Sequence, residues 1–253
     1  MDQIEAAAET RSQLELFHGL SEGRLQLDSS TVRRLSDIGI DAGKTSWLVS
    51  IASNGDSQAL VAAARRTIPG PVLVAPHGAH LCLIHQQKDS FAQSMKTILA
   101  KGGVHPRIAT ARVERLDELP RAHRSSEIAL ATLRLLGGSI LDADSLGLVG
   151  ARLEAESRGE LPYGVEAPAL ALIEHDADSG ADLVRTAWTW MEFGQGITSV
   201  ADRLMIHPNT LRQRLQRITS LLGEGWDVGA RRLEVHLALR SRMLRRELQA
   251  VQD

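Results

Sequence analysis

The chain has 253 residues and a formal net charge of −2 at pH 7, so it is long enough for two domains and is not a globally basic nucleic-acid binder. Its single cysteine, Cys82, excludes an intramolecular disulfide framework and is typical of a reducing compartment. The sequence contains no apolar stretch that could cross a bilayer and no signal peptide, which predicts a cytoplasmic protein without a membrane partner.

The first predicted elements are two helices, which together form a connector over residues 1–41. Residues 2–21 have an apolar stripe at helical spacing, made of Ile4, Ala7, Ala8, Leu14, Phe17 and Leu20. Asp28, Ser29 and Ser30 offer a cap for a shorter helix that ends near Gly39. The stripe of the first helix either packs on its own domain or pairs with another subunit, and the sequence favours neither alternative.

Residues 42–142 are predicted to alternate between strands and helices. The predicted strands are 47–51, 71–75, 80–85 and the edge strand 106–110, and the predicted helices are 57–67, 91–99 and 125–136. The order βαββαβα is that of a ferredoxin-like sandwich. We therefore predict the α+β class: a ferredoxin-like domain that is followed, after a helical linker over residues 143–178, by an all-α domain over residues 179–253.

The all-α domain is predicted to contain a helix-turn-helix. A helix over 181–193 offers core residues, namely Leu183, Ala187, Trp190 and Met191. Thr198 or Ser199 can cap a short helix with an apolar patch of Val200, Ala201 and Leu204, and residues 205–207 supply the turn. The closing helix over 230–248 is expected to place Leu233, Leu237 and Leu244 on one face.

The segment 206–218, read as IHPNTLRQRLQRI, has the pattern of a recognition helix, which is predicted to run from Pro208 to Ser220. Pro208 suits the first helical position, and Leu211, Leu215 and Ile218 share one face. The opposite face is rich in side chains that read base edges or bind phosphates. The distribution of charge supports a DNA-binding role for this part of the chain. Residues 203–253 contain ten arginines and five acidic residues, whereas the rest of the chain is acidic.

Residues 183–239 resemble the C-terminal helix-turn-helix of PucR/CdaR-type bacterial transcription regulators. That family has a motif HxNTLRxRLxRI, which this chain matches at His207, Asn209, Thr210, Leu211, Arg212, Arg214, Leu215, Arg217 and Ile218. Ala187 and Trp190 depart from the usual Leu and Tyr, and both suit a core role. The same helix is similar to the Fis nucleoid protein over a shorter stretch.

Seven residues are candidates for DNA binding: His207, Asn209, Thr210, Arg212, Gln213, Arg214 and Arg217. Helical geometry directs Gln213 away from the core, and we expect base contacts from Asn209, Thr210, Arg212 and Gln213 and a backbone contact from Arg217. Arg214 lies only about 60° from the leucine stripe, so it either contacts DNA, as the resemblance implies, or braces the domain. His207 either caps the helix and braces the turn or contacts a phosphate.

By pattern and position, residues 42–142 resemble the GGDEF-like domain of CdaR-type regulators. Diguanylate cyclases need a GG(D/E)EF turn and carboxylates that hold Mg²⁺, but this chain has Pro76, His77, Gly78, Ala79 and His80 in the turn. We therefore expect a regulatory or dimerising module without catalytic residues or a cofactor. The chain is also expected to lack the family's usual N-terminal sensor domain, as a short member or as a piece of a longer protein.

Other candidate sites have simpler structural interpretations. His77, His80 and His85 cluster in one hairpin, but alternation predicts that His77 and His85 share a face and His80 takes the other, so we expect no metal site. Cys82 is expected to be a buried, inert thiol. The pair His175 and Asp176 is expected at a helix end, and Ser125 and Ser126 are expected as a helix cap.

Together these features predict a DNA-binding transcription regulator and not an enzyme. A single reading helix covers few base pairs, so binding to double-stranded DNA as a homodimer or higher oligomer is expected, with RNA polymerase as a further partner. Two alternatives remain at this level. One is a Fis-like architectural DNA-binding protein, and the other is a nucleotide-binding enzyme related to diguanylate cyclases.

Overall fold

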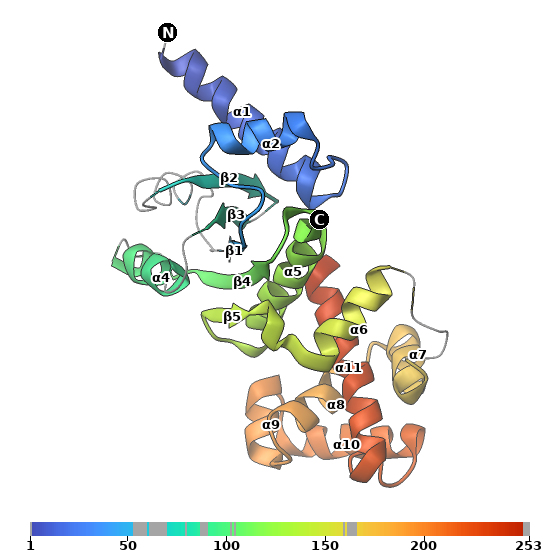
Figure 1. Cartoon of the computed structure of the whole chain (residues 1–253). Coiled ribbons are helices and arrows are strands. Elements are labelled where there is room, and N and C mark those ends of the chain that lie inside the picture. Colours follow the sequence, from blue (N-terminus) through green and yellow to red (C-terminus); the bar gives the residue numbers. More distant parts are fainter. Residues whose placement is uncertain are drawn as a thin grey trace. The chain divides into compact units, whose positions relative to one another are not determined.

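The computed structural model describes residues 2–52, 60, 70–78, 80–86, 91–101, 103, 105–158, 160 and 166–249 (Figure 1). The chain divides into two compact units, Met1–Glu154 with Glu247–Asp253, and Ala155–Arg246. This division falls inside the segment 143–178 that the sequence predicts as a linker. Within the described ranges, every helix is too short or too polar to span a lipid bilayer.

The first unit contains a five-stranded sheet in the order β2-β3-β1-β4-β5. Its strands are β1 (Ser46–Ala52), β2 (Val72–His77), β3 (His80–His85), β4 (Arg107–Val113) and β5 (Ile140–Asp142). The pairs β1–β3, β1–β4 and β2–β3 are antiparallel, whereas β4–β5 is parallel. The arrangement of β1 to β4 is that of a ferredoxin-like sheet, which confirms the predicted α+β class.

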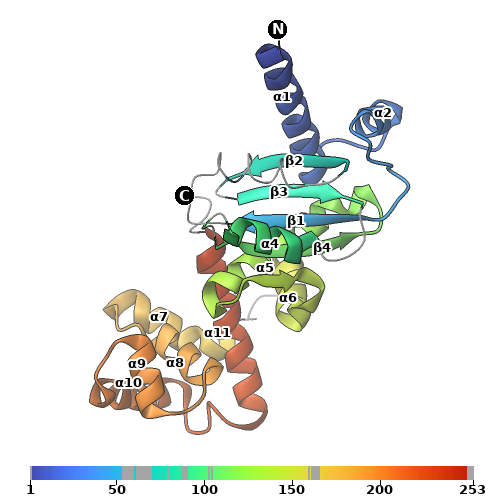
Figure 2. The same cartoon turned by 90° about the vertical axis from the view of Figure 1, so that its left-hand side faces the viewer.

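Helices cover both faces of this sheet (Figure 2). One face packs against α1 (Asp2–Ser21) and α5 (Leu119–Leu136), with Phe17, Leu48 and Leu130 in a shared core. The other face packs against α4 (Phe91–Lys101), where Met95 and Leu99 join Val49 and Ile51 in a second core. Alternate side chains of each strand point to opposite faces, so a single sheet contributes to both cores.

The described part of α1 packs on its own unit. Leu16, Phe17 and Leu20 are buried in the first core, and Leu14 packs against it. Of the two alternatives for the apolar stripe, these residues follow the intramolecular one. The remaining described elements of this unit are α2 (Ser29–Asp37), which Asp28 caps as predicted, the short 3-10 helices Leu116–Glu118 and Ala143–Leu146, and the first part of α6 (Gly147–Ser157).

Three predictions about this unit need correction or lie outside the described residues. The strand predicted at 106–110 is not an edge strand, because the short β5 pairs with its outer side. Ser125 and Ser126 do not cap α5, which begins at Leu119 with Pro120 in its first turn. The helix predicted at 57–67 falls outside the described residues, except for Leu60, which is helical and buried.

The predicted alternation of the hairpin histidines is wrong. His77 and His80 are direct partners across the β2–β3 hairpin and therefore lie on the same face of the sheet. His85 is five residues beyond His80 on β3 and points to the other face. Only two residues separate His77 and His80, and such a tight connection pairs the residues that flank it.

The second unit is all helical. Its elements are the end of α6 (Gly147–Ser157), a 3-10 helix (Ala167–Ala169), α7 (Leu170–Ser179), α8 (Leu183–Glu192), α9 (Ile197–Leu204), α10 (Pro208–Leu222) and α11 (Gly229–Gln249). Leu183, Ala187 and Met191 of α8 are buried as predicted. On α11, Leu233 is 65% exposed and not in the core, where Val235, Ala238 and Leu239 are buried instead.

Candidate nucleic-acid interface

Helices α9 and α10 form the predicted helix-turn-helix. Val200, Ala201 and Leu204 of α9 pack with Leu211 and Leu215 of α10, and Ile197, Ile206 and Trp190 close the cluster. The small side chain of Ala201 leaves room for the second helix to cross closely. The predicted cap of α9 is wrong, because the helix begins at Ile197 and the Ser199 hydroxyl bonds to the carbonyl of Gly196.

The turn between these helices is set by a left-handed residue. Met205 has φ 55° and ψ 43°, and the amide of Ile206 donates to the carbonyl of Ala201 at 3.0 Å. This closure satisfies the last carbonyls of α9 and reverses the chain direction. The Met205 side chain is 85% exposed, so its burial does not explain the conformation.

His207 and Pro208 start α10. The amide of Asn209 donates to Nδ1 of His207 at 3.2 Å, and Pro208 occupies the first helical position, where a missing amide proton has no cost. The predicted capping role of His207 is therefore present in the structure. Because this cap uses one ring nitrogen, Nε2 is the nitrogen left to face an outside ligand.

The outer face of α10 is polar and open. Asn209, Arg212, Gln213, Gln216 and Arg217 are all exposed, whereas Leu211 and Ile218 on the opposite face are fully buried. Thr210 is half-buried. The predicted DNA contacts require these side chains to be exposed, and among the described residues they are, apart from Thr210. The contacts themselves stay predictions.

Asn209 and Arg212 form a pair one turn apart on this outer face. Nη1 of Arg212 donates to Oδ1 of Asn209 at 2.7 Å. The pair then presents hydrogen-bond donors to solvent, from the Asn209 amide nitrogen and the rest of the guanidinium group. Such a donor set complements guanine O6 and N7 or phosphate oxygens.

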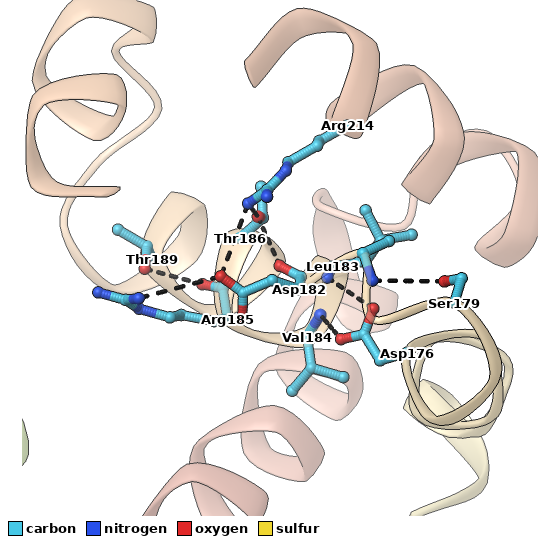
Figure 3. A network of polar contacts seen from close by, with 10 residues as sticks. Asp176, Ser179, Asp182, Leu183, Val184, Arg185, Thr186, Thr189 and Arg214 are labelled. Carbon is cyan, nitrogen blue, oxygen red and sulfur yellow. Dashed lines mark hydrogen bonds and ion pairs between the residues drawn. The ribbon is translucent and has the colours of Figure 1, made fainter. Parts of the chain in front are cut away.

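Arg214 differs from the other arginines of α10, because it points into the domain (Figure 3). Its Nη1 donates to Oγ1 of Thr186 at 3.1 Å and lies 3.6 Å from a carboxylate oxygen of Asp182. The side chain of Arg214 is only 24% exposed. The geometry matches the bracing alternative that helical spacing left open for this residue.

A network of polar contacts fixes the N-terminus of α8, and Arg214 of α10 is part of this network (Figure 3). The two carboxylate oxygens of Asp176 accept from the amides of Leu183 and Val184 at 2.7 and 2.8 Å. Asp182 has a left-handed backbone, with φ 60°, and its carbonyl accepts from the hydroxyl of Thr186. Asp176 therefore caps the start of α8. None of its described contacts suggests acid–base chemistry.

The segment between α10 and α11 is tied to the helix-turn-helix by two tryptophans. Nε1 of Trp190 donates to Asp227 at 2.9 Å, and Nε1 of Trp226 donates to Thr219 of α10 at 3.1 Å. Trp188 is buried and contacts the ring of Phe193, over which the Arg203 guanidinium lies. Helical periodicity did not identify these contacts, because they join residues of different helices and loops, as far apart in the chain as Trp190 and Asp227.

Comparison with known proteins identifies a known domain in this region. Residues 183–241 match the PucR C-terminal helix-turn-helix domain, which covers α8, α9, α10 and most of α11. The prediction of a PucR-type helix-turn-helix is thereby confirmed for these residues.

Curated relatives match a longer stretch. Uncharacterised proteins of Mycobacterium tuberculosis (strains H37Rv and CDC 1551) and of Mycobacterium bovis are 31% identical over 113 residues, which cover 42% of this chain. The matched part is 25% of each relative, so the chain spans about a quarter of the length of these proteins. Among solved structures, a regulator of polyketide synthase expression from Bifidobacterium adolescentis is similar, with a TM-score of 0.45, 18% identity and coverage of 92% of this chain and 93% of that chain.

Proposed function

We propose that this protein is a sequence-specific transcription regulator that inserts α10 into the major groove of double-stranded DNA. The observation that carries the proposal is the two-sided character of α10. Its apolar face is sealed in the domain by Leu211 and Ile218, while five polar side chains stand open on the other face. A helix of this kind in a PucR-type domain has the form that major-groove readers use.

The exposed residues of α10 divide between base reading and positioning. Asn209, Arg212 and Gln213 are proposed to contact base edges, together with Thr210 from its half-buried position. Arg217 is proposed to bind the phosphate backbone, and His207 to offer Nε2 to a phosphate. The donor-rich pair of Asn209 and Arg212 favours guanine at the bases that it meets.

Arg214 is proposed as a positioning residue and not as a DNA contact. Its contacts to Thr186 and Asp182 tie the middle of α10 to the start of α8. This tie fixes the angle at which the outer face of α10 is presented. Its loss is therefore expected to affect domain stability more than base preference.

The proposed active form is a homodimer or a higher oligomer in the cytoplasm. One reading helix contacts only a few base pairs, so two copies on half-sites about one helical turn apart supply useful specificity. We assign residues 42–142 to a GGDEF-like dimerisation or regulatory domain, residues 1–41 to a connector, 143–178 to a linker and 179–253 to the DNA-binding domain. The ferredoxin-like strand order supports this assignment.

The test is recovery of genomic DNA bound to the purified protein, followed by footprinting of the enriched fragments. The wild-type chain is expected to protect discrete sites, and Arg212→Ala or Gln213→Ala is expected to lose about 1–3 kcal/mol of binding free energy at those sites. Arg33→Ala is the matched control, because Arg33 is an exposed helical arginine of the other unit.

Two results would contradict the proposal. Broad protection without discrete sites would indicate an architectural DNA-binding protein in place of a sequence-specific regulator. Equal enrichment of the same sites by the wild type and by Arg212→Ala and Gln213→Ala would remove α10 as the reading helix.

A further inference from the structure

Four potential metal ligands converge at one end of the sheet in the first unit. His77, His80, His123 and Glu127 each offer one ligand atom, and these atoms all lie within 4.8 Å of one another. They come from two places that are far apart in the sequence, the β2–β3 hairpin and helix α5. The sequence pattern predicted no such set, because it placed His77 and His80 on opposite faces.

The local geometry explains why these four side chains meet. His77 and His80 are cross-strand partners at the hairpin, so their rings lie side by side, with centroids 5.3 Å apart. His123 and Glu127 are four residues apart on α5 and therefore share one helical face. The rings of His77 and His123 are 4.6 Å apart, and Nε2 of His77 lies 3.5 Å from Oε1 of Glu127.

The hydrogen bonding of the cluster is incomplete. Both ring nitrogens of His80 and Nδ1 of His77 are buried without a hydrogen-bond partner among the described residues. A buried polar atom without a partner is costly in a folded protein, and a metal ion would satisfy one such nitrogen in each ring. His80 and His123 are almost fully buried, whereas His77 and Glu127 are each 26% exposed and give an ion a route from solvent.

The protonation states also suit a metal. Burial lowers the pKa of His80 and of His123 to about 4, so both rings are neutral at neutral pH and keep a lone pair free. Burial raises the pKa of Glu127, but its contact with His77, together with the neighbouring histidines, lowers the pKa below its usual value overall, so Glu127 remains a carboxylate. The ring of His123 is also held from one side by Cys82, whose Sγ lies 3.7 Å from Nε2.

We propose that His77, His80, His123 and Glu127 form a binding site for a divalent transition-metal ion, with Zn²⁺ as the type that three imidazoles and one carboxylate favour. Tetrahedral zinc places its ligands about 3.3 Å apart, so the four side chains close on the ion by moving about 1 Å. Four protein ligands leave no open position. The ion is therefore structural and fastens α5 to the β2–β3 hairpin, independently of the DNA-binding helices.

The test is metal binding by the full-length, untagged chain after a chelator has removed bound ions. One Zn²⁺ per chain by elemental analysis and a tetrahedral Co²⁺ absorption spectrum are the expected results. His77→Ala and Glu127→Gln are expected to weaken Zn²⁺ binding at least about 100-fold, because each removes a direct ligand. His105→Ala is the matched control, because His105 is exposed and outside the cluster, and it is expected to bind as the wild type does.

Circular dichroism of both variants shows whether they remain folded. Much less than one Zn²⁺ per wild-type chain overturns the proposal, as does wild-type affinity in folded His77→Ala and Glu127→Gln. If both variants unfold, an octahedral Co²⁺ spectrum of the wild type, or displacement of Co²⁺ by equimolar Mg²⁺, overturns it instead.

Discussion

At the scale of single residues, Arg214 needs a test that separates a role in domain stability from a direct contact with DNA. We expect Arg214→Ala to lower the free energy of unfolding by about 1 kcal/mol, because it removes the hydrogen bond to Thr186 and a half-exposed ion pair with Asp182. Urea unfolding followed by tryptophan fluorescence measures the change. Arg212→Ala is the control and should stay within about 0.5 kcal/mol of the wild type. An Arg214→Ala variant with unchanged stability and weaker DNA binding would make Arg214 a DNA contact.

A second residue-scale prediction concerns Asp176, which accepts from two amides at the start of α8. Asp176→Ala should destabilise the helical unit by about 1–2 kcal/mol, because it leaves two helix-terminal amides without their acceptor and removes a negative charge from the positive end of the helix. Thermal unfolding measures this loss. The control is Asp178→Ala, because Asp178 is an exposed aspartate on α7, the helix that also carries Asp176. Equal melting temperatures for the two variants would show that the cap contributes nothing.

At the scale of elements, the packing of α5 on the sheet should depend on pH through two buried histidines. His80 and His123 have a pKa of about 4 in the folded protein, lowered by burial from 6.5. Below pH 6.5 the unfolded chain takes up protons that the folded one does not, so stability is lost as the pH falls from 6.5 towards 4. Each of these two histidines should lower the free energy of unfolding by about 2 kcal/mol when the pH falls from 7 to 5.

Denaturant unfolding in the presence of a chelator, at pH 7 and at pH 5, measures this loss. The control is the same titration with His105→Ala, whose exposed ring should leave the pH dependence unchanged. An unfolding free energy that is flat between the two pH values would mean that His80 and His123 are not held neutral by burial.

The elements also show what the sequence could predict and where it failed. Helical periodicity located α10 and α11 within one or two residues, because apolar spacing and the proline are local signals. The predicted face of His77 was wrong, because the face depends on the length of the turn between β2 and β3. Strand β5 was missed, because its three residues form a strand only through their pairing with β4. The cap of α8 by Asp176 is a contact between two helices, which periodicity does not encode.

At the scale of the whole molecule, the proposed binding of two copies to DNA has consequences that binding through a single helix does not have. Insertion of about 5 base pairs between the half-sites of a recovered operator should strongly reduce affinity, and insertion of about 10 should restore much of it, because the second helix returns to the same side of the duplex. Electrophoretic mobility shift with the three spacings measures this effect. Equal affinity at all spacings would indicate that each copy binds alone.

Salt dependence tests the phosphate contacts of the same complex. Arg217→Ala should weaken binding to all sequences similarly and reduce the slope of log K against log salt by about one unit per subunit. Fluorescence anisotropy over a salt series gives this slope. Gln216→Ala, an uncharged neighbour on the same exposed face, should leave it unchanged. A selective loss at one base pair with an unchanged slope would instead make Arg217 a base-reading residue.

The anchoring of Arg214 limits how binding preference can be exchanged between related proteins. A chimera that received only α10 would depend on its host domain for acceptors at the positions of Asp182 and Thr186, which orient this arginine on α8. A host without them would leave the inner side of the grafted helix unanchored. A change of binding preference by helix grafting should therefore transfer α8 and α10 together as one unit.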